Sequence, residues 1–396
     1  MNKIIILGGS QTGLALARAF GRRGCTVFVI NCYDGSIAQF SKYVKKVYEI
    51  YFNRNEDESE LLNFLLFNKV KFKDAFIIPD NDYSVLILAK MKKDIAHLYS
   101  CLVNDYETIA YCIDKKLTYK VANELDIPVP ITFYPDEQKS IDSIDELIGF
   151  PCIIKPKKSF LFKEDYKQKV VQVRNLEELK RIYDEIRASN HEVIISEIIP
   201  GDDSSLFLYS FYIDREHRVI GEFMAQKIRQ TPPRFGTGGV IRSREIIPEI
   251  RRMSLKLLER INYTGFGMIE YKLDVRDNRY KIIDFNARPI LFYELFHKSK
   301  MHFTDMILSD INNQHVNIPS DYITNTYWID LFGDIYYYLF NIKNTNLTLT
   351  EFISPYLKKT AYDSFSILDP SPFFHHLVLN LKTLLKGRGN RYVVNK

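Results

Sequence analysis

The first 110 residues alternate between short apolar runs and segments with helical spacing. The apolar runs lie at residues 3–7, 26–30 and 75–79. Continuous apolar runs of this length predict strands of a parallel sheet that is buried on both faces. A glycine-rich turn separates the first run from a helix predicted over residues 14–23. This strand–helix–strand order predicts an open parallel sheet over residues 1–110.

Beyond residue 110 the pattern changes to helices mixed with antiparallel strands. Asp114 is placed to cap a helix over residues 115–125. We expect further helices at 175–187 and 248–261, and strands at 150–156, 170–173, 193–199, 207–213, 219–227, 265–273 and 280–285. The last two strands form a predicted hairpin through Asp277-Asn278.

The chain of 396 residues is long enough for two to four modules. We place the boundaries after residues 110, 195 and 310. The last part, residues 311–396, reads as a C-terminal helical extension with loops.

Composition excludes several classes of protein. A net charge of +5 suits anionic small molecules such as ATP, but it is too weak to indicate nucleic-acid binding. The five cysteines are odd in number and form no CxxC pair, which favours reduced thiols in the cytosol. The first residues do not read as a signal peptide, and no apolar run is long enough to cross a bilayer. We therefore expect a cytoplasmic protein.

The glycine-rich turn, residues 8–13, partly matches a dinucleotide-binding motif. Ser10 stands where that motif has its second glycine, and Asn31 ends the second strand where an acidic residue would hold the ribose. We interpret the segment as a tight turn without a cofactor, and an NAD(P)-dependent oxidoreductase stays an alternative. Residues 80–82 end another strand, where they either touch substrate or form a solvated turn.

The predicted hairpin carries candidate metal ligands. Asp284 and Asn286 are two residues apart on one strand, so their side chains project from the same face. Antiparallel pairing can bring Glu270 beside them. Two carboxylates and an amide oxygen suit Mg²⁺ that also holds phosphates, and Arg288 follows on the same face. The alternative is the polar face of an ordinary edge hairpin.

Other segments supply candidate ligands for a nucleotide. Lys155 ends an apolar strand, and Lys115 begins a helix, where phosphate oxygens are favoured. Residues 197–203 end a further strand, where backbone groups could pair with an adenine edge and a carboxylate could hold ribose hydroxyls.

These motifs, in this order and spacing, resemble the ATP-grasp superfamily over roughly residues 1–310. The resemblance implies an α/β (α+β) ATP-grasp fold with lobes at 111–195 and 196–310, preceded by a Rossmann-like parallel-sheet domain. It also implies ATP and Mg²⁺, with Mn²⁺ as a second candidate metal. The implied roles are phosphate binding by Lys115 and Lys155, adenine binding by Glu197 and Ile199, ribose binding by Asp203, metal binding by Glu270, Asp284 and Asn286, and stabilisation of the acyl phosphate or tetrahedral intermediate by Arg288.

The sequence departs from the superfamily pattern at two places. Asp284 stands where many relatives carry glutamate, so the geometry of the metal site is the feature most open to change. The segment after Lys155 lacks the glycine-rich cover over the phosphates and is rich in lysines instead. Lys169, at the start of a strand, is the lysine that we expect to reach the nucleotide.

The resemblance implies a ligase that joins a small carboxylate to an amine through an acyl phosphate. Residues 227–239 read as a substrate loop, in which Lys227, Arg229 and Arg234 supply cations for a carboxylate or phosphate. More loosely, the chain resembles ligases of the D-aspartate ligase type and proteins of cell-wall or surface-polymer synthesis. A carbamoyl-phosphate-synthase-like or carboxylase-like enzyme and a non-catalytic nucleotide-binding module are the alternatives.

The tail contains an apolar helix over residues 375–385, followed by Lys386, Arg388 and Arg391. We favour packing of this helix on the body over contact of a basic amphipathic end with a membrane. The sequence leaves a homodimer open.

Overall fold

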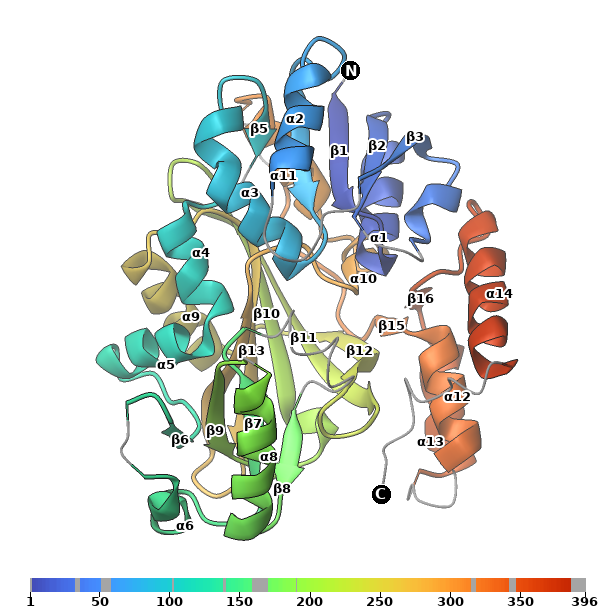
Figure 1. Cartoon of the computed structure of the whole chain (residues 1–396). Helices are drawn as coiled ribbons and strands as arrows, with labels where there is room; N and C mark the ends of the chain where they lie inside the picture. The colour runs from blue at the N-terminus through green and yellow to red at the C-terminus, as the bar shows by residue number, and fades with distance from the viewer. Residues whose placement is uncertain are drawn as a thin grey trace.

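The computed structural model describes residues 2–32, 36–50, 58–101, 103–137, 140–158, 170–189, 191–314, 318–341 and 347–385. Its strands form three sheets. Figure 1 shows the N-terminal sheet at the top, the smallest sheet at the bottom, the strands of the largest sheet between them, and the last helices along the right side.

The N-terminal sheet is parallel, with the strand order β3-β2-β1-β4-β5. Its strands are β1 (Lys3–Gly8), β2 (Thr26–Asn31), β3 (Val44–Glu49), β4 (Ala75–Pro79) and β5 (Ser100–Cys101), and its helices are α1 (Gln11–Gly21), η1 (Ala38–Phe40), α2 (Ser59–Phe67) and α3 (Asp82–Ile95). Ile4 and Ile6 enter one hydrophobic cluster, whereas Ile5 and Leu7 enter another. Both faces of β1 are therefore covered, which explains its continuous apolar run and confirms the predicted parallel sheet.

The smallest sheet is antiparallel, with the order β6-β9-β7-β8, and encloses a core of its own. It consists of β6 (Thr132–Phe133), β7 (Cys152–Pro156), β8 (Val171–Val173) and β9 (Val193–Glu197), with η2 (Ile141–Ser143), α6 (Ile144–Leu147) and α8 (Leu176–Ala188) beside it. The preceding helices, α4 (Tyr106–Ile113) and α5 (Lys115–Glu124), contribute to a core that they share with strands of the largest sheet. Asp114 caps α5 by accepting hydrogen bonds from the backbone N–H groups of Lys116 and Leu117, as predicted.

The largest sheet has the order β14-β13-β10-β11-β12-β15-β16. Its strands are β10 (Leu206–Ile213), β11 (Val219–Thr231), β12 (Thr237–Arg244), β13 (Gly265–Asp274), β14 (Arg279–Asn286), β15 (Tyr327–Ile329) and β16 (Thr360–Tyr362), and its helices are η3 (Asp203–Ser205), α9 (Pro248–Arg260), α10 (Tyr293–Lys298) and α11 (Phe303–Ile311). The antiparallel pairs β10–β11 and β13–β14 confirm the two strand pairs predicted from the sequence.

Two segments differ from the sequence prediction. Residues 227–239 are not a loop, because β11 continues to Thr231 and β12 begins at Thr237. Gly238 and Gly239 have low β propensity, so the start of β12 is invisible in the pattern. The extension is not only helical either, because β15 and β16 join the largest sheet. Its helices are α12 (Leu331–Asn341), α13 (Leu349–Ile353), η5 (Ser354–Leu357) and α14 (Ser371–Leu385).

A buried ion pair attaches the C-terminal extension to the N-terminal domain. Arg18 on α1 donates from Nε to Asp369 over 3.0 Å, and both side chains are 1% exposed. Ser41 Oγ and the backbone N–H of Lys42 donate to the same carboxylate. Beside this contact, α14 packs on the body, since the ring of His375 stacks on Phe40 at 3.6 Å.

None of the described helices is long and apolar enough to cross a membrane.

We expect Asp369→Ala to lower the free energy of unfolding by about 3–5 kcal/mol, because it leaves the Arg18 guanidinium buried without its carboxylate. Urea denaturation measures the change. Arg181→Ala is the matched control, since it removes an ion pair to Glu185 in which both side chains are more than half exposed, and it should cost less than about 1 kcal/mol. Equal effects of the two substitutions would contradict the assigned role of Asp369.

Candidate active site

The centre of the candidate site is a pair of carboxylates on neighbouring strands. Glu270 on β13 lies directly opposite Asp284 on β14, and Asn286 lies two residues further along β14. The three side chains therefore share one face of the largest sheet. In the described part of the chain, no three His, Cys, Asp or Glu side chains gather as a metal-binding group. The third oxygen ligand of a metal ion at this position would be the side-chain amide oxygen of Asn286.

Two lysines from different parts of the fold contact these carboxylates. Lys227 on β11 places Nζ 2.5 Å from Glu270 Oε1, and its side chain is 7% exposed. Lys115, the first residue of α5, places Nζ 2.5 Å from Asp284 Oδ1. The two carboxylates carry like charges on directly opposed residues and therefore repel each other. The two ammonium groups offset this repulsion without any ligand.

Lys155 adds a third buried ammonium group. It lies on β7 of the smallest sheet and is 6% exposed. Burial, and then the nearby charge of Lys115, lower the pKa of Lys155 to about 8. A desolvated lysine of this kind gains from contact with an anion, because the anion favours its charged form.

Arg288 links the carboxylate face to the N-terminal domain. Its Nε and Nη2 atoms donate hydrogen bonds to the two carboxylate oxygens of Asp82 at 2.6 and 3.2 Å. Nη2 also donates to Asn286 Oδ1 at 3.2 Å. Asp82 belongs to the 80–82 segment at the carboxyl end of β4. The structure thus brings this segment to the site through one arginine.

Asp80 accepts hydrogen bonds from the turn before α1, the part of a Rossmann-like fold that binds a dinucleotide phosphate. Its Oδ2 accepts hydrogen bonds from Gly9 N at 2.7 Å and from Ser10 N and Oγ, both at 2.8 Å. A Cβ atom at Gly8 would lie 1.8 Å from Asp80 Oδ1, and Gly8 has a φ of +137°. The glycines therefore accommodate an internal carboxylate at the start of α1, which supports the interpretation as a turn without a cofactor.

The residues predicted to line the adenine and ribose make internal contacts. Glu197 is 4% exposed and accepts hydrogen bonds from Ile131 N, Arg276 and Lys281. These groups lower the pKa of Glu197 although burial opposes the shift. Its carboxylate thus holds β9 to the β13–β14 turn. Ile199 is buried just after β9.

Asp203 accepts hydrogen bonds from Gln230 N, Gln230 Nε2 and Arg234 N. The carboxylate predicted to hold the ribose therefore ties the turn between β11 and β12 to η3.

Arg229, which was also predicted for the site, lies apart from the carboxylate pair. Arg229 forms a two-pronged ion pair with Asp334 on α12, at 2.9 and 2.7 Å, instead of joining Lys227. Sequence reasoning missed Asp334, because no local pattern marks a partner 105 residues away. Lys169 lies outside the described residues.

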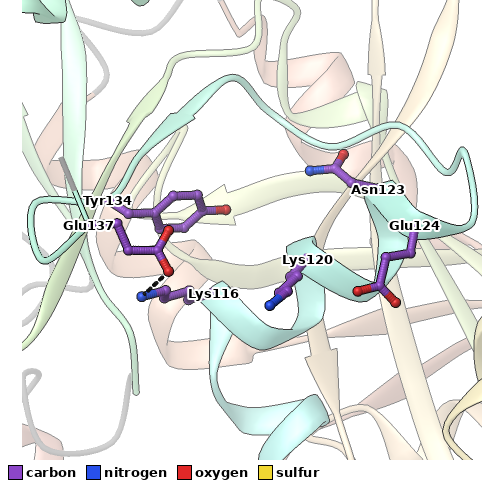
Figure 2. Close-up of a pocket in the computed structure, with 6 residues that line it drawn as sticks. All are labelled: Lys116, Lys120, Asn123, Glu124, Tyr134 and Glu137. Carbon is purple, nitrogen blue, oxygen red and sulfur yellow. Dashed lines mark ion pairs between the residues drawn. The ribbon is translucent and has the colours of Figure 1, made fainter.

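A polar cavity of about 340 Å³ lies beside α5. Figure 2 shows its lining residues, Lys116, Lys120, Asn123, Glu124, Tyr134 and Glu137. Lys116 pairs with Glu137 at 2.8 Å across it. Four of the lining residues follow Lys115 along α5, whereas Tyr134 and Glu137 come after β6, and none of the predicted site residues is among the six.

The chain is similar to proteins that are named ligases or synthetases. No family model matches the sequence. The chain is 25% identical over 301 residues to D-aspartate ligase from Enterococcus faecium, a match that covers 72% of this chain and 70% of the relative.

Two solved structures share the fold. N5-carboxyaminoimidazole synthetase from Staphylococcus aureus, complexed with ADP, has a TM-score of 0.62 at 16% identity and covers 82% of this chain and 80% of that one. L-amino acid ligase from Bacillus licheniformis has a TM-score of 0.60 at 14% identity and covers 78% and 74%, respectively.

We expect Asp80→Ala to destabilise the protein by about 1–3 kcal/mol, because it leaves buried N–H groups at the start of α1 unsatisfied. Urea denaturation measures this loss. The wild-type protein should not bind NADH in a fluorescence titration, since the carboxylate already fills the phosphate position. Saturable NADH binding by the wild type would contradict this interpretation of the turn.

Proposed function

We propose that this chain, which has the ATP-grasp fold, is an ATP- and Mg²⁺-dependent ligase that joins a small carboxylate to an amine. The observation that carries the proposal is the Glu270–Asp284 pair with Lys227 and Lys115 on its two carboxylates. The similarity to D-aspartate ligase over most of both chains supports it.

The carboxylate face has the chemistry that a magnesium ion requires. Glu270, Asp284 and Asn286 offer hard oxygen donors on one face, and the shorter side chain at Asp284 lies directly across from Glu270. Mg²⁺ bound there would neutralise charge that develops on the phosphates. The three residues are proposed as its ligands.

The buried lysines are proposed to bind the phosphates of ATP. Lys115 and Lys155 come from α5 and β7, and Lys155 lies close enough to Lys115 for their charges to oppose each other. This mutual repulsion is relieved when phosphate oxygens lie between the two ammonium groups. We propose backbone groups near Ile199 as the adenine contact and Asp203 as the ribose contact.

The proposed reaction has two steps. The substrate carboxylate attacks the γ-phosphate of ATP, which gives an acyl phosphate and ADP. An amine then attacks the acyl carbon, and phosphate leaves as the amide forms. We propose that Lys227 holds the carboxylate substrate or the transferred phosphoryl group. We also propose that Arg288, which donates to Asp82, stabilises the oxyanion of the tetrahedral intermediate. No side-chain nucleophile is needed.

The proposed substrate class draws on the sequence relative. D-aspartate ligase is named for an amino acid substrate, and we propose an amino acid as the carboxylate or the amine partner. A role in cell-wall or surface-polymer precursor synthesis is part of the proposal. The carboxylase-like alternative draws on the likeness to the carboxyaminoimidazole synthetase, which at 16% identity extends to the fold alone.

A screen of amino acids with amine acceptors should reveal phosphate release from ATP that depends on Mg²⁺ and on both substrates. Glu270→Ala should reduce this rate by about 10²–10³-fold or more, because the charge of the transferring phosphoryl group loses its stabilisation. Glu259→Ala, an exposed glutamate of α9, is the matched control and should keep full activity. A fully active Glu270→Ala variant would overturn the metal assignment. ATP binding without phosphate release for any pair would favour the non-catalytic module.

ATP binding should take up protons near pH 8. The pKa of Lys155 is about 8 in the free protein, so in about half of the molecules this side chain is neutral at pH 8. Phosphate oxygens beside it would raise its pKa. Affinity should therefore fall as the pH rises above 8. Titration calorimetry in buffers of different ionisation enthalpy measures the uptake, which Lys155→Met should abolish. Equal uptake in both proteins would show that another group titrates.

A further inference from the structure

The C-terminal extension exposes apolar side chains far out of proportion to its length. Among the described residues, 21 large hydrophobic side chains are exposed, and twelve of them lie between residues 335 and 381. Single exposed hydrophobic residues need no explanation, but a concentration of them marks an interaction surface.

Helix α14 carries apolar side chains on two sides, one packed against the protein and the other exposed. On the inner side, Phe373 stacks on Phe332 at 5.3 Å and His376 contacts Ser364 Oγ at 3.2 Å. On the outer side, Phe374, Val378 and Leu381 are 59%, 47% and 47% exposed. Their spacing of four and three residues places them in one stripe along the helix.

The turn before α14 also exposes apolar side chains. Ile367 and Leu368, the two residues directly before the Asp369-Pro370 segment that leads into the helix, are 84% and 65% exposed. We define the outer face as the side chains of Ile367, Leu368, Phe374, Val378 and Leu381.

The side chains from α14 to the end of the sequence include cations but no acids. From residue 370 to the end, the sequence holds no Asp or Glu and five cations, Lys382, Lys386, Arg388, Arg391 and Lys396. Between residues 335 and 369 the acids are Glu351, Asp363 and Asp369. Asp363 and Asp369 are buried, while Glu351 closes a capping box with Thr348. An apolar stripe beside cations, without exposed acids on its own helix, matches a surface with negative charge and an apolar interior.

We propose that the outer face docks on a membrane that contains anionic lipids. The helix would lie in the interface plane, with the stripe among the acyl chains and Lys382 among the headgroups. The four cations that follow Lys382 in the sequence add to the positive charge of this end of the chain. A second copy of the chain fits less well. A two-fold interface would bring two copies of the same basic helix together, with no acid from residue 370 onward to pair with their cations.

Vesicle sedimentation with the full chain tests the proposal independently of ligase activity. The protein should bind vesicles of phosphatidylcholine with phosphatidylglycerol, and binding should weaken at least tenfold without phosphatidylglycerol or in high salt, since each cation near an anionic surface strengthens binding about fivefold. The triple variant Phe374→Ser, Val378→Ser, Leu381→Ser should lose binding. Phe67→Ser with Val70→Ser is the matched control, because these side chains are 89% and 83% exposed on the N-terminal domain, and it should bind like the wild type.

A charge variant and the oligomeric state complete the test. Lys382→Glu with Lys386→Glu should weaken vesicle binding at least tenfold while the apolar stripe is intact. Light scattering should give the same oligomeric state for the wild type and the triple variant. A wild-type dimer that the triple variant dissociates, without vesicle binding, would show that a second copy covers the outer face. Unchanged vesicle binding by the triple variant would also overturn the proposal.

Discussion

The arrangement of the candidate site depends on two carboxylates that the sheet places face to face. Glu270 and Asp284 are directly opposed on β13 and β14, a pairing that is unfavourable unless cations neutralise it. The neutralising lysines come from elsewhere, Lys227 from β11 and Lys115 from the start of α5. This electrostatic requirement therefore ties the largest sheet to the helix that leads into the smallest one. It also provides the groups that a metal ion and phosphates would use.

The N-terminal domain takes part in the same network through carboxylates at one end of its sheet. Asp80 holds the turn at the start of α1, and Asp82 orients Arg288 beside Asn286. The N-terminal sheet has the strand order of a nucleotide-binding sheet, but the N–H groups of its glycine-rich turn donate to Asp80. Its remaining contribution to the site is the orientation of the arginine.

Much of the fold could be predicted because its elements have local signals. The apolar runs of β1, β2 and β4 give buried strands, and Asp114 gives the start of α5. The alternation of Asp284 and Asn286 correctly places both side chains on one face. By contrast, β12 has glycines as its second and third residues, and β15 and β16 are three residues each, so neither propensity nor periodicity marks them.

The site was predicted less completely, since its partners are distant in sequence. Glu197 binds Arg276 and Lys281, and Arg229 binds Asp334. These pairings depend on the tertiary fold, so a local sequence pattern cannot predict them. Residues predicted to bind a ligand therefore have protein partners as well. The predicted role of Glu197 rests on the resemblance alone, and that of Arg229 rests on the cations of residues 227–239.

The most direct test of the account follows oxygen atoms through the reaction. The carboxylate substrate is labelled with ¹⁸O in its carboxyl group, and the phosphate released from ATP is analysed by mass spectrometry. If the substrate carboxylate attacks ATP at the face formed by Glu270, Asp284 and Arg288, one ¹⁸O atom from the carboxylate passes into each phosphate released with the amide. Amide formation with unlabelled phosphate would contradict an acyl-phosphate ligase.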